Sequence, residues 1–305
     1  MILIAGPTAS GKSALALALS RLLPVTIINA DASQVYRDLE IVSARPAPDE
    51  ERQAPHRLFG HVDGAESYSA AHWAKDARET IAKVQANWRI PLLVGGTGLY
   101  IRTLLDGIAP VPEIDPVVRR TVRALSVAEA HSALTVEDPV TATRLSASDT
   151  TRVARALEVV RSTGMPLAHW QAQRIGGIGS EVRLVPMILL PPREWLLSRC
   201  DSRFDVMLAE GGKEEVATLI ARGLDPALPV MRAIGVREMA GMLADPARAP
   251  SLAEQAKTAT RQYAKRQYTW FRNQPPAAWP RIDAQLDNDS INHLAIKLQR
   301  MTLTD

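Results

Sequence analysis

The sequence predicts an α/β protein with a doubly wound parallel sheet and an all-helical insertion domain. Three observations lead to this prediction. Short apolar runs bounded by turn residues alternate with helical patterns in the first third of the chain. A glycine-rich stretch that contains a lysine directly follows the first apolar run. Between about residues 113 and 178 every pattern is helical, and a strand pattern then returns.

The composition is that of a globular protein of ordinary polarity. The chain has 305 residues, 46% hydrophobic and 23% charged, which is enough for more than one domain. The single cysteine, Cys200, excludes an internal disulfide framework and a cysteine-only zinc site. The sequence shows no signal peptide and no apolar stretch of the ~18 residues that a membrane helix needs. We therefore expect a cytoplasmic protein without a membrane partner.

Each expected element follows from its local pattern. The apolar runs 2–5, 25–28, 90–94 and 184–190 are short and continuous, as in buried parallel strands. Helical spacing of apolar residues, often after a capping residue, predicts the helices. The core helices are expected at 12–22, 69–88, 193–210, 212–222, 233–243 and 251–273, and the insertion helices at 115–125, 126–134, 139–145, 149–163 and 166–173. The domains are thus 1–112 with 179–305 as a core, and 113–178 as the helical insertion.

The residues after the first strand match the phosphate-binding pattern G-x-x-x-x-G-K-[ST]. The match lies between a strand and a helix, the context that this pattern requires. Backbone N–H groups of such a loop bind phosphate oxygens, a lysine adds a cation, and a hydroxyl can hold Mg²⁺. The sheet is therefore P-loop NTPase-like and should bind a di- or triphosphate. The residues of the loop are Gly6, Pro7, Thr8, Ala9, Ser10, Gly11, Lys12 and Ser13, with Ser13 as the metal-binding hydroxyl.

Two features argue against an ordinary NTPase or kinase. The strand at 90–94 ends in Gly95-Gly96-Thr97-Gly98, where a magnesium-binding acid is usual. An acid, Asp31, instead follows the strand at 25–28, and both strand ends open onto the same crevice as the loop. Two plainer interpretations remain open. Asp31 could be only a helix N-cap, and the glycine pair only a tight turn with positive φ.

Seven sequence blocks, in order, resemble the tRNA dimethylallyltransferases, also called tRNA isopentenyltransferases. The family's GPTASGK[ST] stands at 6–13, INADSxQVY at 28–36, PHHL…YSA at 55–58 and 68–71, and VGGTGLYI at 94–101. DxxRxxRALEV stands at 149–159, an Arg-Phe to Ile-Gly block at 203–235, and TRQYAKRQxTWFR at 260–272. Departures are Ser43-Ala44-Arg45 for the family's TAK, Arg57 for a histidine, and Val236 for a tyrosine.

The resemblance implies a reaction and assigns its residues. A dimethylallyl group would move from dimethylallyl diphosphate to N6 of the adenosine 3′ of a tRNA anticodon, releasing diphosphate. Asp31 would be the general base and Thr8 would contact the adenine. Lys12, Mg²⁺ and a second cation, Arg203 with Arg232 behind it, would stabilise the leaving group. The adenosine must leave its stack to reach this crevice.

The resemblance also implies contacts to the tRNA anticodon stem-loop. A basic segment, 257–272, should be a helix with Arg261, Lys265, Tyr268 and Arg272 on one face, suited to RNA. Alternatively its cations only face solvent, while Tyr263, Gln267 and Trp270 pack inward. The implied tRNA-binding residues are Asp31, Ala32, Ser33, Gln34, Thr97, Arg119, Thr151, Arg152, Val153, Ala154, Arg155, Val230, Met231, Arg232, Ala233, Ile234, Gly235, Arg261 and Lys265.

Three rival functions remain. An adenylate isopentenyltransferase would use the same loop on a free nucleotide, but needs neither the helical insertion nor the basic segment. A small-molecule kinase is disfavoured by the missing acid after residue 94. An RNA-binding module with a vestigial loop is disfavoured because Lys12, Ser13 and Asp31 are all present. By resemblance we expect a monomer.

Overall fold

The structure, a computed structural model, describes residues 1–304. It divides into two compact units, which we describe separately. Unit 1 consists of Met1–Thr103 and Gly179–Asp305, and unit 2 of Leu104–Ile178.

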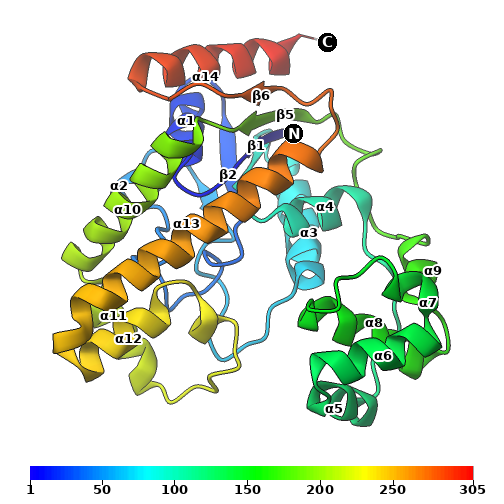
Figure 1. Ribbon diagram of the computed structural model, residues 1–305. Coiled ribbons are helices and arrows are strands. Elements are labelled where there is room, and N and C mark those ends of the chain that lie inside the picture. The colour runs from blue at the N-terminus through cyan, green and yellow to red at the C-terminus, as the bar shows by residue number, and fades with distance from the viewer. Residues whose placement is uncertain (305) are drawn as a thin grey trace. The chain divides into compact units, whose positions relative to one another are not determined.

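Unit 1 is built on a six-stranded parallel sheet with the strand order β3-β2-β4-β1-β5-β6 (Figure 1). The parallel, doubly wound sheet predicted from the sequence is confirmed. Its two edge strands were not predicted, because two residues are too few to show a pattern. The strands are β1 (Ile2–Ala5), β2 (Val25–Asn29), β3 (His56–Arg57), β4 (Ile90–Gly95), β5 (Val185–Leu189) and β6 (Arg281–Ile282).

The central strands are largely apolar because helices cover both faces of the sheet, and the two polar residues of β2, Thr26 and Asn29, are buried as well. On one face Ile2 and Ile4 join a core cluster with α1 (Lys12–Ser20) and α14 (Asn288–Leu303). On the other, α3 (Ala70–Ala86) contacts β2 and β4. There the Trp73 indole donates to the Asn29 carbonyl at 2.9 Å and stacks on Tyr100 at 4.7 Å. Tyr100 lies in α4 (Gly98–Asp106), a helix that was not predicted.

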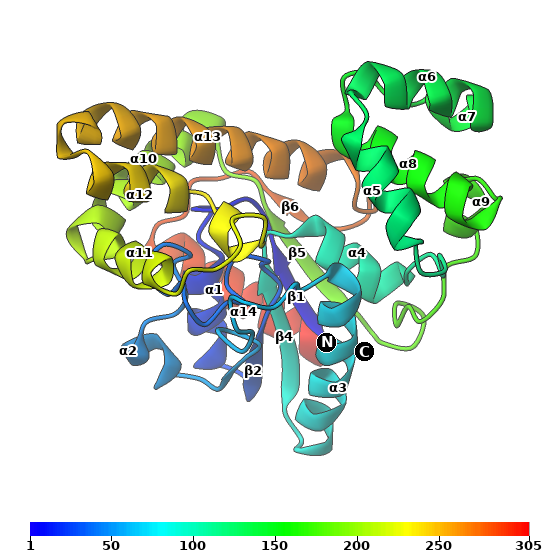
Figure 2. The same cartoon turned by 90° about the horizontal axis from the view of Figure 1, so that it is seen from below.

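Four helices that follow β5 form a layer along one side of unit 1 (Figure 2). α10 contacts α13, α13 contacts α12, and α12 contacts α11. The helix expected at 233–243 begins later, because Gly235 adopts a φ of +97° immediately before it. The bounds are α10 (Arg193–Ala209), α11 (Gly212–Ala221), α12 (Val236–Ala244) and α13 (Ala249–Asn273), with short turns α2 (Pro48–Glu51), η1 (Val230–Arg232) and η2 (Pro246–Arg248).

Unit 2 is helical and has its own hydrophobic cluster. Its helices are α5 (Pro116–Ala124), α6 (Val127–Glu137), α7 (Pro139–Ala142), α8 (Thr150–Thr163) and α9 (Leu167–Gln171). The cluster includes Val122, Leu134, Val153 and Leu157, all at most 1% exposed. Side-chain oxygens cap four helices; Ser126 and Glu129 form a capping box at the start of α6.

None of the helices within residues 1–304 combines the length and the apolarity that crossing a membrane requires.

Candidate active site

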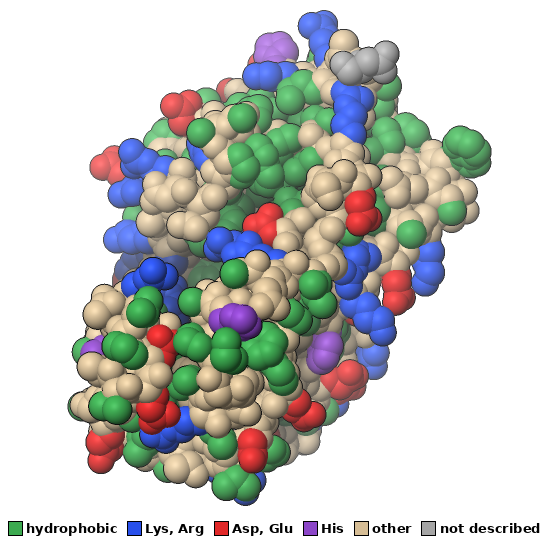
Figure 3. Space-filling model, turned by 90° about the vertical axis from the view of Figure 1, so that its right-hand side faces the viewer, with side chains coloured by type: hydrophobic (Ala, Val, Ile, Leu, Met, Phe, Trp, Pro, Cys, Tyr) green, Lys and Arg blue, Asp and Glu red, His purple; other side chains and the backbone are tan. Residues whose placement is uncertain are grey.

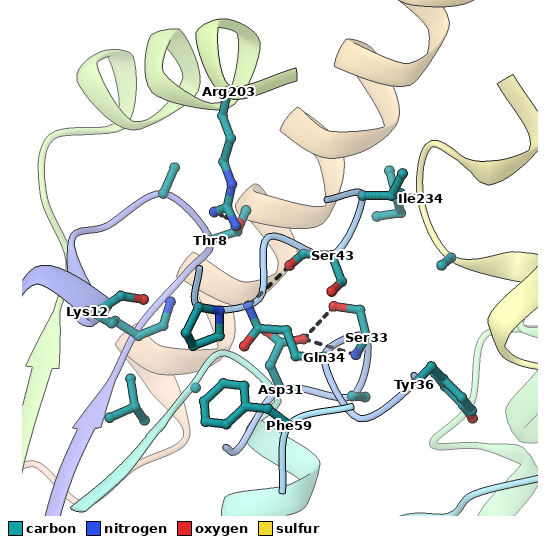
Figure 4. Close-up of a pocket in the computed structure, with 18 of the residues that line it drawn as sticks. Thr8, Lys12, Asp31, Ser33, Gln34, Tyr36, Ser43, Phe59, Arg203 and Ile234 are labelled. Atoms are coloured by element: carbon teal, nitrogen blue, oxygen red, sulfur yellow. Dashed lines mark hydrogen bonds between the residues drawn. The ribbon is translucent and has the colours of Figure 1, made fainter. Parts of the chain in front are cut away.

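The carboxyl ends of β1, β2 and β4 open into a cavity of about 350 Å³, lined entirely by unit 1 (Figure 4). Its polar lining comes mainly from the loop after β1, the segment after β2 and helix α10, with further polar residues from β3, η1 and α13. Most of the remaining lining is apolar. The polar residues include Thr8, Lys12, Ser13, Asp31, Gln34, Arg203 and Arg232, and the apolar ones include Leu17, Ile27, Val42, Phe59, Val94, Phe204, Met207 and Ile234.

The loop after β1 has the conformation that a phosphate-binding loop needs. Gly6 has a φ of +154°, and a Cβ there would lie 2.4 Å from the Leu189 carbonyl oxygen. Gly11 has a φ of +95° and directly precedes α1, so the N-terminus of α1 faces the cavity. The Lys12 ammonium donates to the Pro7 carbonyl at 2.7 Å. Backbone and lysine are thus arranged before any phosphate binds.

Lys12, Arg203 and Asp31 influence one another's charge in this cavity. Burial lowers the pKa of Lys12 to about 8; Asp31 opposes this shift and Arg203 adds to it. Burial is also the main reason that the pKa of Arg203 is lowered, again opposed by Asp31. Buried cations are costly without anions to compensate them. The lining holds the cations Lys12, Arg203 and Arg232 against the carboxylates Asp31 and Glu50, so positive charge is in excess and the cavity favours an anionic ligand.

Three side chains from α10 and α13 hold the outer part of the loop. The Arg203 guanidinium donates to the Thr8 hydroxyl at 3.1 Å, and Arg199 donates to the Ala9 carbonyl at 3.1 Å. The Gln267 side-chain oxygen accepts from the Thr8 N–H at 2.8 Å. Arg203 therefore lies at the loop, as the sequence predicted. The roles of Arg199 and Gln267 were missed, since no local pattern marks them.

Asp31 is an acceptor in a turn and does not cap a helix. Its Oδ1 accepts from the Ser33 N–H at 3.1 Å and from the Ser33 hydroxyl at 2.7 Å. No helix begins in the residues that follow, so the N-cap interpretation is wrong. The Asn29 side chain fixes the turn, accepting from the Asp31 N–H at 2.8 Å and donating to the Asp31 carbonyl at 3.0 Å.

The glycine pair after β4 is explained by close packing. Neither glycine has a positive φ, so the tight-turn interpretation is wrong. A Cβ on Gly95 would lie 2.1 Å from the Ala30 carbonyl oxygen, and one on Gly96 would lie 2.3 Å from the Gln267 amide nitrogen. Thr97 follows, and its hydroxyl accepts from the Ala32 N–H at 2.9 Å. These contacts fix the backbone around Asp31.

Gln34 and Arg45 both bind main-chain carbonyls of the segment after β2. The Gln34 amide lines the cavity and donates to the Ser43 and Ala44 carbonyls at 3.1 and 2.6 Å. Arg45, which departs from the family's lysine, donates to the Tyr36 carbonyl at 3.2 Å. Arg45 is not among the cavity's lining residues. Its guanidinium therefore supports the loop instead of contacting a phosphate.

The segment 230–235 contributes to the cavity through three of its six residues. Arg232, Ala233 and Ile234 line it, whereas the Val230 side chain is fully buried elsewhere in unit 1. The predicted contacts from this segment can therefore come from residues 232–234, with Arg232 as a second cation near Arg203.

The basic segment of α13 divides into paired and exposed cations. Arg261 is held by Asp201 at 2.9 and 2.8 Å and by Glu254 at 2.6 Å, while Lys265 is exposed. The Tyr268 hydroxyl donates to the Leu190 carbonyl at 3.3 Å, and Arg193 stacks on its ring at 4.9 Å. Gln267 packs inward. The structure thus supports parts of both interpretations.

In unit 2 the predicted tRNA-binding residues differ in exposure. Arg119, Thr151 and Arg152 are exposed, whereas Val153 and Ala154 are at most 5% exposed and belong to the unit's core. Their side chains are therefore not available to RNA.

Unit 2 also contains a buried carboxylate that the sequence analysis did not single out. Glu158 is 1% exposed and accepts from Arg123 at 2.5 Å, with Arg155 at 4.0 Å. Its place in a helix was predictable, but its two arginine partners were not.

A metal ion in this cavity would find few protein ligands among the described residues. In residues 1–304 no cluster of three or more His, Cys, Asp or Glu side chains is arranged to hold a metal. Mg²⁺ commonly uses few protein ligands together with substrate phosphates and water. The Ser13 hydroxyl, on the cavity wall beside Lys12, fits that role.

Basic side chains gather at several places on the face in Figure 3, with acidic and apolar side chains between them. This distribution agrees with a net charge of only +3.

Comparison with known proteins identifies the family. The IPP transferase family matches residues 34–274. A tRNA dimethylallyltransferase of Sphingopyxis alaskensis is 61% identical over all 305 residues and all of its own length. One of Erythrobacter litoralis is 56% identical over 92% of this chain and 90% of its own length.

Comparison with solved structures points to the same family. A tRNA isopentenylpyrophosphate transferase of Bacillus halodurans is 30% identical, with a TM-score of 0.68 over 99% of this chain and 97% of its own. A eukaryotic dimethylallyltransferase acting on tRNA is 28% identical, with a TM-score of 0.76 over 88% of this chain and 69% of its own. These enzymes share the P-loop NTPase-like sheet. The chain therefore belongs to the IPP transferase family, the enzymes named tRNA dimethylallyltransferases.

Proposed function

We propose that this enzyme transfers a dimethylallyl group from dimethylallyl diphosphate to N6 of the adenosine 3′ of the anticodon in tRNA and releases diphosphate. One observation carries the proposal. The phosphate loop, Arg203 and Asp31 face one cavity whose remaining lining is largely apolar. Such a cavity accommodates a diphosphate and a small hydrocarbon group together. The comparisons support tRNA as the acceptor, because the relatives are named for it.

The leaving group gathers charge as the allylic C–O bond breaks. Lys12, the loop N–H groups and Arg203 stabilise that charge, with Arg232 nearby on the cavity wall. The Ser13 hydroxyl would hold Mg²⁺, which would supply further positive charge at the leaving group. The whole diphosphate departs, so no acid is needed after β4 to assist transfer of a terminal phosphoryl group.

Asp31 acts on the acceptor. The adenine N6 lone pair is delocalised into the ring, so the amine is a weak nucleophile. As N6 forms its bond to the allylic carbon, the Asp31 carboxylate accepts one N6 proton. Ser33 holds Asp31 through its Oδ1 (Figure 4), which leaves Oδ2 beside Gly96. Thr8, whose hydroxyl is oriented by Arg203, contacts the adenine edge.

The adenosine reaches the cavity by leaving its stack in the anticodon loop. Exposed cations then bind the RNA backbone: Lys265 on unit 1, and Arg119 and Arg152 on the helical unit 2. We propose that unit 2, which contains the helical insertion, contacts tRNA. One chain supplies the whole cavity lining, so a monomer suffices.

A competition assay tests this function. Labelled dimethylallyl diphosphate is offered together with undermodified tRNA, AMP and water. We expect the label in tRNA. Label in AMP and none in tRNA would show an adenylate isopentenyltransferase and overturn the proposal.

A further inference from the structure

Gln267 is a buried polar side chain in the middle of α13 that has no part in the chemistry proposed above. It is 5% exposed, and both ends of its amide are in use. Its oxygen accepts from the Thr8 N–H at 2.8 Å, and its nitrogen donates to the Gly96 carbonyl at 2.8 Å. One side chain therefore joins the phosphate loop after β1 to the turn after β4.

The junction lies beside the reacting groups. A Cβ placed on Gly96 would lie 2.3 Å from the Gln267 nitrogen, 3.2 Å from the Gly6 carbonyl oxygen and 3.3 Å from Asp31 Oδ2. The start of the phosphate loop, the glutamine and the carboxylate thus meet at Gly96. A shift of the loop relative to this turn would change the distance between the bound diphosphate and Asp31.

Only an amide satisfies both partners. A carboxylate at this position would accept from the Thr8 N–H but would face the Gly96 carbonyl and the nearby Asp31 without a donor. A methionine would fill the space and satisfy neither group. Tyr263, one turn earlier on α13, lines the cavity that holds the reacting groups.

We propose that Gln267 is a positioning residue, which sets the register between the phosphate loop and the Gly96 turn and so aligns the allylic carbon with the acceptor nitrogen at Asp31. This inference rests on the proposed function. Gln267 also lies two residues after the exposed Lys265. A helix that binds RNA through Lys265 is thereby connected directly to the site of the leaving group.

The test compares Gln267→Met and Gln267→Glu with Gln262→Met, a matched control on an exposed position of the same helix. Steady-state kinetics give kcat and the KM of each substrate, filter binding gives tRNA affinity, and thermal unfolding reports the fold. The assay also measures how much dimethylallyl diphosphate is lost to water. We expect kcat to fall ten- to a hundred-fold in both Gln267 variants, as misplacement of reacting groups does.

We expect tRNA affinity to stay within about two-fold, and the share of label lost to water to rise. The control should match the wild type. Wild-type kcat and partitioning in Gln267→Met would overturn the proposal. A loss of activity that is due only to weaker tRNA binding would also overturn it, because Gln267 would then be an RNA contact. A loss of activity that disappears when rates are measured well below the melting temperature would overturn it too, because the variant would then only be less stable. If the wild type itself modifies AMP, the proposed function fails, and the same comparison with AMP still tests Gln267.

Discussion

Lys12 shows how burial at one residue creates a binding site. Its ammonium lies near Arg203 and has only the Pro7 carbonyl and the Asp31 carboxylate to offset its charge. Burial lowers its pKa to about 8, so the free enzyme holds this charge at a cost. A diphosphate removes that cost by supplying the missing negative charge. The sequence pattern of the loop and the electrostatics of the cavity therefore favour the same kind of ligand, an anion.

This pKa predicts how binding of dimethylallyl diphosphate depends on pH. The charged lysine binds the anion, and below about pH 8 it is already protonated in the free enzyme. Above that value binding must first take up a proton, so affinity should fall by up to about tenfold per pH unit. Calorimetric titration between pH 7 and 9.5 measures this affinity. Lys12→Met should bind weakly and with a flatter profile; a flat wild-type profile would contradict the assignment.

Asp31 offers a second test at this scale. In Asp31→Asn the side chain can still accept from Ser33 but cannot take the N6 proton. We expect kcat to fall about 10²- to 10⁴-fold, with diphosphate binding kept. Ser33→Ala, which removes the hydroxyl bonded to Asp31 at 2.7 Å, is the control and should cost much less. Rapid-quench measurements of the rate of label transfer distinguish the Asp31→Asn enzyme from the Ser33→Ala enzyme. An active Asp31→Asn enzyme would remove Asp31 as the base.

At the scale of elements, α11 supports the segment that forms one wall of the cavity. The Glu215 carboxylate accepts from three successive N–H groups, those of Glu40, Ile41 and Val42, at 2.6, 2.9 and 2.8 Å. From the same helix, Arg222 pairs with Asp38 and with Asp63. The segment after β2 has little regular structure of its own. Its shape therefore depends on a helix about 170 residues further along the chain.

Glu215→Ala should loosen this segment. Three N–H groups would lose a charged acceptor, and we expect a loss of about 2 kcal/mol in the free energy of unfolding. Hydrogen exchange should accelerate at the amides of residues 40–42. The exposed neighbour Glu214→Ala is the matched control and should change neither quantity. Unchanged protection at residues 40–42 would show that the segment holds its shape by itself.

At the scale of the whole molecule, the basic side chains of α13 are of two kinds, those paired with a protein carboxylate and those exposed to solvent. Arg261 is paired with Asp201 and Glu254, and Lys257 with Asp205. Lys265 is exposed, three residues before Tyr268, whose hydroxyl donates to the Leu190 carbonyl after β5 and whose ring lies under Arg193, the first residue of α10. A basic stretch of sequence thus contains both structural ion pairs and surface charges. The two kinds should respond differently to salt.

We expect Lys265→Ala to reduce the slope of log affinity against log salt for tRNA by about one, because one phosphate contact and its released counterion are lost. Arg261→Ala should leave the slope nearly unchanged and instead weaken the packing of α10 on α13, seen as a lower melting temperature. Filter binding at several salt concentrations gives the slopes. An unchanged slope in Lys265→Ala would exclude that residue from the interface.

Much of this molecule was determined by local patterns in its sequence. The four central strands are largely apolar runs because both of their faces are covered, and several helices begin at a capping side chain that the sequence shows. The phosphate loop needs only glycines at defined positions between a strand and a helix. Asp31 could be placed at the same edge of the sheet because parallel strands end together. The sequence therefore predicted the sheet, the loop and the position of Asp31 at the same cavity as that loop.

Tertiary structure alone decided which distant groups meet. The strands β3 and β6 have two residues each, and their pairing partners define them. No local pattern distinguishes Gln267 from other helical glutamines, and only the fold places the phosphate loop and Gly96 against it. In the same way, only the fold places the segment after β2 against Glu215. Arg261 looks like an RNA contact until Asp201 comes within 2.9 Å. Hydrogen bonds and ion pairs depend on distance in space, and sequence patterns carry only the distance along the chain.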